Sequence, residues 1–124
     1  MNREMIFLGA QDVRNLLSIE DCISAVEHAF RLYGEGKAQG PGVLGMHTKE
    51  GGFHVKAGLL DLDAHYFAAK INGNFPLNPM RFGLPTIQGI IILCDAGKGT
   101  PLAIMDSRDV TSLRTAAATA VAAR

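Results

Sequence analysis

The sequence has 124 residues, and its 12 lysines and arginines are balanced by 12 aspartates and glutamates. This length is enough for one domain, and a content of 48% hydrophobic and only 19% charged residues excludes a disordered chain. Zero net charge argues against broad binding to nucleic acid or to an acidic membrane, because both need a basic surplus.

The first half of the chain predicts two helices and a hairpin. A short helix is expected over 9–17, and Ser18 then has the position of a helix N-cap. Apolar residues at spacings of three and four predict an amphipathic helix of about four turns. These residues are Ile19, Cys22, Ile23, Val26, Phe30 and Tyr33. Further on, period-two alternation predicts strands over 43–48 and 53–59, joined by a turn at 50–52.

The second half predicts three strands and a final helix. A strand is expected over 66–75, followed by a loop rich in Asn, Pro and Gly that ends at residue 85. A buried strand over 88–94 and its hairpin partner over 101–105 come next. The segment 107–124 predicts a helix whose alanines form a face suited to close packing. Helices, then strands, then a helix indicate the α+β class.

No segment predicts export or membrane insertion. The N-terminus begins with only a short apolar stretch, and the strongest apolar run, 90–94, is far below the roughly 20 residues of a membrane-spanning helix. Cys22 and Cys94 lie far apart without metal-ligand spacing, which is typical of reduced, buried thiols. We therefore expect a cytoplasmic protein that binds no membrane and no nucleic acid.

The familiar motifs of phosphate, metal and nucleophile chemistry are missing. Residues 97–100, Gly-Lys-Gly-Thr, lack the spacing of a phosphate-binding loop and lie between two predicted strands, which favours a solvated hairpin turn. The histidines are scattered and form no paired-ligand motif, so no metal site is expected. They are His28, His47, His54 and His65. No serine or cysteine nucleophile motif occurs, and the catalytic residues stay unassigned.

Two lysines stand in the middle of predicted strands with no acidic residue close to them. Between Ala64 and Cys94 the chain has no Asp or Glu, yet Lys70 lies there. Lys56 occupies the middle of the preceding strand. A cleft lysine without a carboxylate partner is available to an anionic ligand, whereas a lysine on the wet face of a half-exposed sheet needs no partner. The spacing permits both interpretations.

Arg114 lies close to the expected start of the final helix. If Thr111 caps that helix, Arg114 falls in the first turn, where a cation opposes the helix dipole. An anion bound there would satisfy Arg114, Thr115 and the free backbone N–H groups together. The alternative is an arginine paired with Asp106 or Asp109.

Three segments resemble the ornithine cyclodeaminase/mu-crystallin family. They are 69–76 (Ala-Lys-Ile-Asn-Gly-Asn-Phe-Pro), 83–89 (Gly-Leu-Pro-Thr-Ile-Gln-Gly) and 111–117 (Thr-Ser-Leu-Arg-Thr-Ala-Ala), and their order and intervals also fit. The resemblance covers essentially the whole chain. It implies an NAD(P)-dependent enzyme acting on an amino acid or a cyclic imine, through ornithine cyclisation, alanine dehydrogenation or ketimine reduction.

The resemblance also implies roles for single residues. Lys70 corresponds to the lysine that contacts the substrate carboxylate, and Arg114 lies where substrate and cofactor meet. Thr86 corresponds to a residue that contacts the dinucleotide, and Thr115 is a further expected cofactor contact. Many members carry an arginine in the first barrel strand that this sequence lacks, and Lys56 is expected to supply its carboxylate contact.

The family architecture implies an antiparallel, barrel-like curved sheet with flanking helices that forms a homodimer through the sheet. Residues 1–124 are then the N-terminal substrate-binding and dimerisation domain, ending in the helix that leads to a Rossmann domain missing from this sequence. NAD or NADP is not expected to bind tightly to this chain alone, since one small domain does not hold both halves of such an enzyme. The alternatives are a non-catalytic ligand-binding or assembly module of mu-crystallin type, and a truncation product without a role.

Overall fold

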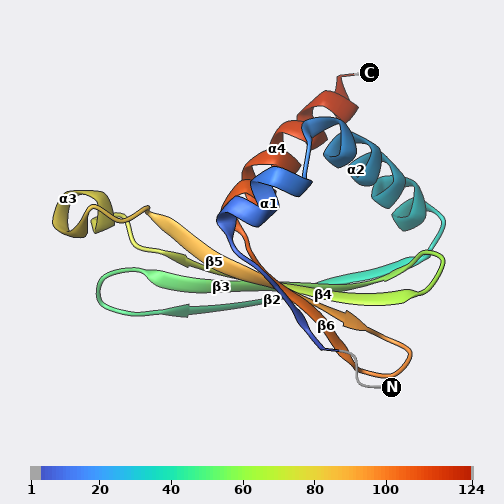
Figure 1. Ribbon diagram of the computed structural model, residues 1–124, viewed down its shortest axis with the longest axis horizontal. Helices are drawn as coiled ribbons and strands as arrows, with labels where there is room; N and C mark the ends of the chain where they lie inside the picture. Colours follow the sequence, from blue (N-terminus) through green and yellow to red (C-terminus); the bar gives the residue numbers. More distant parts are fainter. Residues whose placement is uncertain (1–3, 124) are drawn as a thin grey trace.

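A computed structural model describes residues 4–123 and shows a mixed α+β architecture, with one six-stranded sheet and four helices. Three helices lie over one side of the twisted sheet, and the fourth projects beyond its end (Figure 1). The strands are β1 (Ile6–Leu8), β2 (Ala38–His47), β3 (Gly52–Asp61), β4 (His65–Asn74), β5 (Ile87–Asp95) and β6 (Pro101–Asp106). The helices are α1 (Ala10–Leu16), α2 (Ile19–Gly34), α3 (Asn78–Phe82) and α4 (Arg108–Ala122).

The strand order across the sheet is β1-β6-β5-β4-β3-β2. From β2 to β6 each strand pairs antiparallel with the next strand in the sequence. In this part of the sheet, strands that are neighbours in space are therefore also consecutive in the chain. The short β1 closes the other edge by pairing parallel to β6, with Ile6 opposite Ala103. Because side chains alternate between the two faces of a strand, this register decides which residues share a face.

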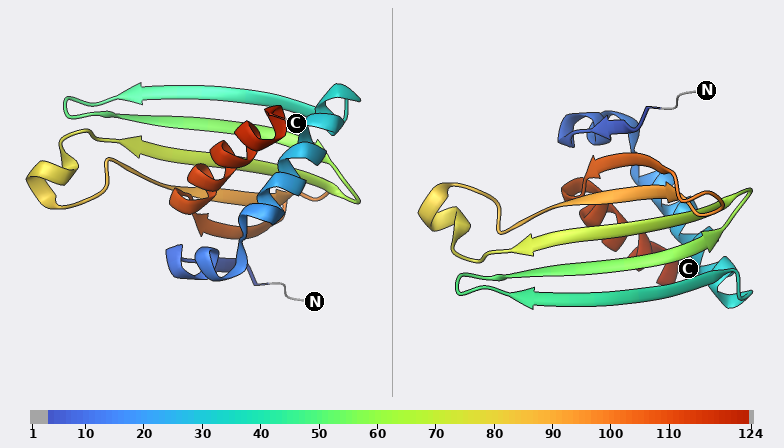
Figure 2. Two further views of the ribbon diagram at one scale, coloured as in Figure 1. Left: turned by 90° about the horizontal axis from the view of Figure 1, so that it is seen from above. Right: turned by 90° about the horizontal axis from the view of Figure 1, so that it is seen from below.

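Helix α4 is fixed to the sheet at its N-cap residue, Ser107. Ser107, which is 0% exposed, donates its hydroxyl proton to Asn72 Oδ1 at 2.7 Å, and its backbone N–H donates to the Gly89 carbonyl at 3.1 Å. These bonds join the start of α4 to β4 and β5. Further along, α4 lies beside α2 (Figures 1 and 2), and Ala117 is fully buried as the alanine-rich face predicts.

The face of the sheet turned away from the helices is apolar and uncovered by any described element (Figure 1). Phe7, Leu44 and Met46 are 68%, 56% and 65% exposed. The apolar side chains that the register places on this face are Phe7, Leu44, Met46, Phe53, Val55, Leu59, Phe67, Ile71, Ile90, Ile92 and Ile104. No lysine or arginine of β1–β6 shares these positions, so this face offers water a broad and mainly apolar surface. Its polar residues are Gln39, Asp61, His65, Gln88 and Asp106.

Most predicted elements are confirmed, including α2 with its Ser18 N-cap, whose Oγ accepts the Asp21 backbone N–H at 3.1 Å. The loop predicted between the third and fourth strands was wrong in part, because it contains α3, with Pro79 in its first turn. The three-residue β1 was not predicted. The barrel-like curvature stays a prediction.

Both cysteines are free. Cys22 is buried as predicted, and burial, with Asp21 beside it, raises the pKa of its thiol, whereas Cys94 is only half-buried. Among residues 4–123, no helix has the length and apolar character needed to cross a membrane.

Candidate functional site

The strand pairing brings the two mid-strand lysines directly together. Lys56 on β3 is opposite Lys70 on β4, and both lie on the same face as Asn72. The bond between Asn72 and Ser107 shows that this is the face that α4 covers. Like charges opposite each other across antiparallel strands destabilise a sheet, so this pair has no evident purpose in folding.

The two lysines line a depression of about 280 Å³. It is lined by Val43, His54, Lys56, Lys70, Asn72, Asn74 and Ile87. His54 lies opposite Asn72 across the β3–β4 pair, and its ring contacts the edge of His47 at 5.8 Å between centroids. The sequence analysis assigned no site role to His54 or Asn74. The sequence did place His54 on the same strand face as Lys56, and Asn74 on the same strand face as Lys70, because each pair is separated by an even number of positions. Only the β3–β4 register shows that these two faces form one site.

Arg114 completes a cluster of three basic residues with Lys56 and Lys70. Burial lowers the pKa of Lys70 first, and the positive charges of Arg114 and then Lys56 lower it further. Lys70 is half-buried, and none of the three side chains takes part in an ion pair within residues 4–123. A half-buried lysine beside two other cations fits the anion-binding interpretation better than the wet-face alternative.

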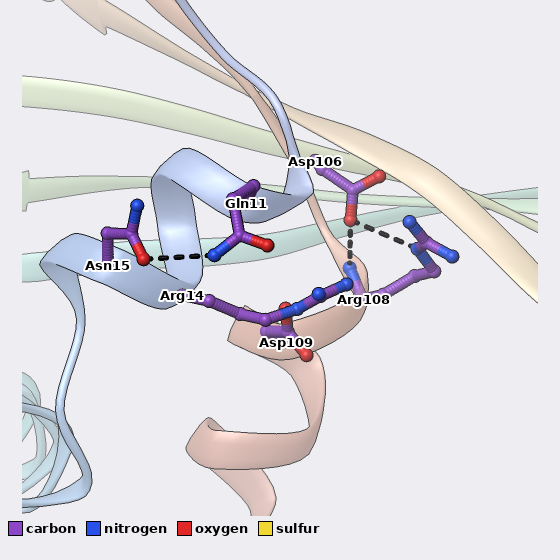
Figure 3. A network of polar contacts seen from close by, with 6 residues as sticks. All are labelled: Gln11, Arg14, Asn15, Asp106, Arg108 and Asp109. Carbon is purple, nitrogen blue, oxygen red and sulfur yellow. Dashed lines mark hydrogen bonds and ion pairs between the residues drawn. The ribbon is translucent and has the colours of Figure 1, made fainter.

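The carboxylates nearest to Arg114 in the sequence are used elsewhere. Asp109 Oδ2 accepts from Arg14 Nε at 2.8 Å, which ties α1 to α4 (Figure 3). Asp106 Oδ1 accepts from Arg108, from its backbone N–H at 2.9 Å and from its Nε at 3.3 Å (Figure 3). The alternative in which Arg114 pairs with Asp106 or Asp109 is therefore wrong.

The helix predicted over 107–124 is confirmed, but Thr111 is not its cap. Helix α4 begins at Arg108 after Ser107, because Ser107 is held by the sheet, and Thr111 is an interior residue rather than the cap. Arg114 is thus six residues beyond the first helical residue, about 9 Å along the axis. The free backbone N–H groups of the helix start do not lie beside it, so they do not form one anion site with Arg114.

The two threonines expected to contact the cofactor lie outside the depression. Thr115 is exposed on α4, and its hydroxyl donates to the Thr111 carbonyl at 2.9 Å. Thr86 is half-buried just before Ile87, a lining residue, and its carbonyl accepts the Phe75 backbone N–H at 2.8 Å. Lys56 and Lys70 therefore line the depression together and the charge of Arg114 acts on Lys70, whereas neither threonine lines the depression.

The arrangement suits a small organic anion. Basic groups, amide groups and an imidazole surround the depression, and no carboxylate lines it. Within residues 4–123, no cluster of three or more His, Cys, Asp or Glu side chains is placed to hold a metal ion. An α-amino or imino acid would meet its carboxylate with two or three cations here.

The sequence and the fold match a known class of proteins. The profile of the Ornithine cyclodeaminase/mu-crystallin family matches residues 3–124, and the chain belongs to this family.

Similar proteins include NAD-linked enzymes of amino acid metabolism. The chain is 38% identical to the alanine dehydrogenase of Archaeoglobus fulgidus over 98% of its own length and 36% of that protein's. An archaeal alanine dehydrogenase dimer with bound NAD is similar at a TM-score of 0.84 and 38% identity, over 92% of this chain and 34% of that one. The Thermococcus litoralis Delta(1)-pyrroline-2-carboxylate reductase, solved with NADH and L-proline, is similar at a TM-score of 0.86 and 32% identity, over 93% of this chain and 36% of that one. The chain thus spans about a third of the length of these relatives.

Proposed function

We propose that this chain is the N-terminal substrate-binding and dimerisation domain, residues 1–124, of a cytoplasmic NAD(P)-dependent enzyme that acts on a small amino acid or cyclic imine. The observation that supports this most directly is the opposed pair of Lys56 and Lys70 in a depression lined by no carboxylate, with the charge of Arg114 near enough to lower the pKa of Lys70. Membership of the family and the NAD-linked relatives support the reaction class.

In this proposal, Lys70 and Arg114 hold the carboxylate of the substrate. Lys70 has little solvent to give up because it is half-buried, and a bound anion relieves its repulsion with the neighbouring cations. Fixing the carboxylate orients Cα and its nitrogen, which is the geometric requirement for hydride transfer at that carbon. When bound, NAD(P) supplies or accepts the hydride.

The described residues do not form a complete site for the dinucleotide. Thr86 and Thr115 are isolated from each other in the sequence, and the Thr115 hydroxyl proton is already donated within α4. The sequence contains no Gly-x-Gly-x-x-Gly that follows a strand and opens a helix. We propose that Thr86 and Thr115 lie at the edge of a cofactor site, and we expect the isolated chain to bind NAD(P) weakly.

The partner that we propose for the open face of the sheet is a second copy of this chain. The archaeal relative is a dimer, and an apolar face without lysine or arginine suits burial against a symmetric copy of itself. In this proposal the barrel-like curvature of the sheet belongs to the dimer.

The test of the site uses the full-length gene product. We expect Lys70→Met and Arg114→Met each to lower kcat/KM at least tenfold in NAD(P)-linked turnover of alanine, proline or ornithine, whichever is turned over, equal to about 1.4 kcal/mol of lost transition-state binding. Lys98→Met, in the exposed turn between β5 and β6, is the matched control. A loss below tenfold in both variants, with the control unchanged, would contradict the assignment.

A second experiment separates the enzyme from the non-catalytic alternative. The large open face is compatible with an assembly module as well, so the purified 124-residue chain and the full-length product should be assayed side by side. Turnover by the full-length product alone is the expected result. Turnover by the 124-residue chain would contradict the domain assignment, and a dimer that binds a small carboxylate without any turnover in either form would favour the alternative.

A further inference from the structure

The basic cluster holds more positive charge than one carboxylate neutralises. Lys56, Lys70 and Arg114 lie together, and none of them has an acidic partner within residues 4–123. If a carboxylate occupies the space between Lys70 and Arg114, Lys56 is left beside them without a counter-charge. A repulsive lysine at such a position weakens the sheet unless a second anion offsets it.

The cluster also extends over several strands. Helix α4, which carries Arg114, starts over β4 and β5 through the bonds of Ser107 to Asn72 and Gly89. Lys56 belongs to β3, on the side toward β2, where its register partner is Val43. The three basic residues therefore come from α4, β4 and β3, and Lys56 and Lys70 line the depression from two adjacent strands.

Neutral hydrogen-bond donors accompany Lys56 at the β3 end. His54, two residues before Lys56, lines the same depression and lies opposite Asn72. Asn74 lines it further along β4. Imidazole and amide N–H groups donate to carboxylate oxygens and add direction to the charge of a lysine.

We propose that Lys56, with His54 beside it, binds a second carboxylate, so that the substrate is a dicarboxylic amino or imino acid. This inference rests on the proposed function, in which Lys70 and Arg114 hold the first carboxylate. The same charges act against a diamino acid, because a side-chain ammonium would meet Lys56 and no carboxylate of the lining residues.

The test is a set of NMR-monitored titrations of the full-length protein with three unreactive probes. Succinate carries two carboxylates, butyrate carries one, and 5-aminopentanoate carries one carboxylate and an ammonium group. We expect succinate to bind at least tenfold more tightly than butyrate, and 5-aminopentanoate to bind more weakly than butyrate. Lys56→Met should remove the preference for succinate, because it should weaken succinate binding several-fold more than butyrate binding.

Matched variants keep the result interpretable. Lys56→Arg keeps the charge and should restore most of the preference, which a loss of folding at this position would not allow. Lys49→Met, in the exposed turn between β2 and β3, should bind all three probes like the natural protein. Lys70→Met should weaken succinate and butyrate together.

The outcomes distinguish a failure of this inference from a failure of the proposed function on which it rests. Equal binding of succinate and butyrate, or an equal loss of both in Lys56→Met, overturns the second-carboxylate site. If Lys70→Met leaves both probes unaffected, the proposed function itself fails. Tight binding of 5-aminopentanoate overturns the exclusion of diamino acids, whatever the other probes show.

Discussion

The direct opposition of Lys56 and Lys70 predicts that removing one of the two charges stabilises the ligand-free protein. Opposite residues on antiparallel strands have Cβ atoms about 5 Å apart, so we take the two ammonium groups to be about 6 Å apart. Their repulsion is then about 0.7 kcal/mol at the dielectric constant of water and about 3 kcal/mol at an effective value of about 20. Because Lys56 is exposed, we expect Lys56→Met to raise the free energy of unfolding by roughly 1 kcal/mol at low salt.

Urea unfolding of Lys56→Met beside the natural chain, at equal protein concentration and neutral pH, measures this gain. The Debye length is about 30 Å at 0.01 M salt and about 3 Å at 1 M, so the gain should be largely lost at high salt. Lys49→Met removes an exposed lysine from the nearby turn and should change stability much less. A destabilised Lys56→Met, or a gain that persists at 1 M salt, would refute the reasoning, because neither follows from charge repulsion.

Three further predictions concern other parts of the chain. The pKa of Lys70 is lowered in the folded protein, so between that lowered value and about 10.4 the unfolded chain binds more protons than the folded chain. Stability should therefore rise with pH as the pH approaches about 10.4, and Lys70→Met should remove this rise in urea unfolding. Ser107→Ala removes the buried bond to Asn72 and should cost about 1–2 kcal/mol of unfolding free energy, with Ser112→Ala, exposed on α4, as the near-neutral control; equal losses would contradict a specific anchor. Met46→Glu on the open face should weaken self-association at least tenfold in sedimentation velocity, whereas Met80→Glu, at an even more exposed position on α3, should not. Dimers unaffected by Met46→Glu would place the interface elsewhere.

Local patterns predicted the long elements because those elements are locally determined. The apolar stripe of α2 and its Ser18 cap lie within one continuous segment, and the strand pairs β2–β3 and β5–β6 are joined by short turns. Two elements were missed: α3, a five-residue helix within the predicted loop, and β1, which depends on a distant partner. β1 exists through pairing with β6, about a hundred residues away, and α4 begins at Arg108 because Asn72 and Gly89 hold Ser107.

The same distinction applies to the candidate site. The strand lysines and Arg114 were identifiable from the sequence because acidic residues are missing around them and because the family resemblance marks their positions. That Lys56 lies opposite Lys70, and that His54 lies opposite Asn72, follows from the β3–β4 register. Whether Arg114 pairs with Asp109 could not be predicted, because Asp109 instead pairs with Arg14, 95 positions away in the sequence. No local sequence pattern connects Arg14 with Asp109.

Strands β3 and β4 carry two kinds of surface, interleaved residue by residue. Even positions such as Lys56 and Lys70 face the depression, while odd positions such as Val55 and Ile71 face the open apolar side. Inserting one residue into the turn at 48–51 would shift β3 by one position, placing the Lys56 charge on the hydrocarbon face and Val55 in the anion site. The length of that turn therefore affects ligand binding and subunit contact at the same time. A substitution at a single position of β3 or β4, by contrast, changes only the face on which that side chain lies.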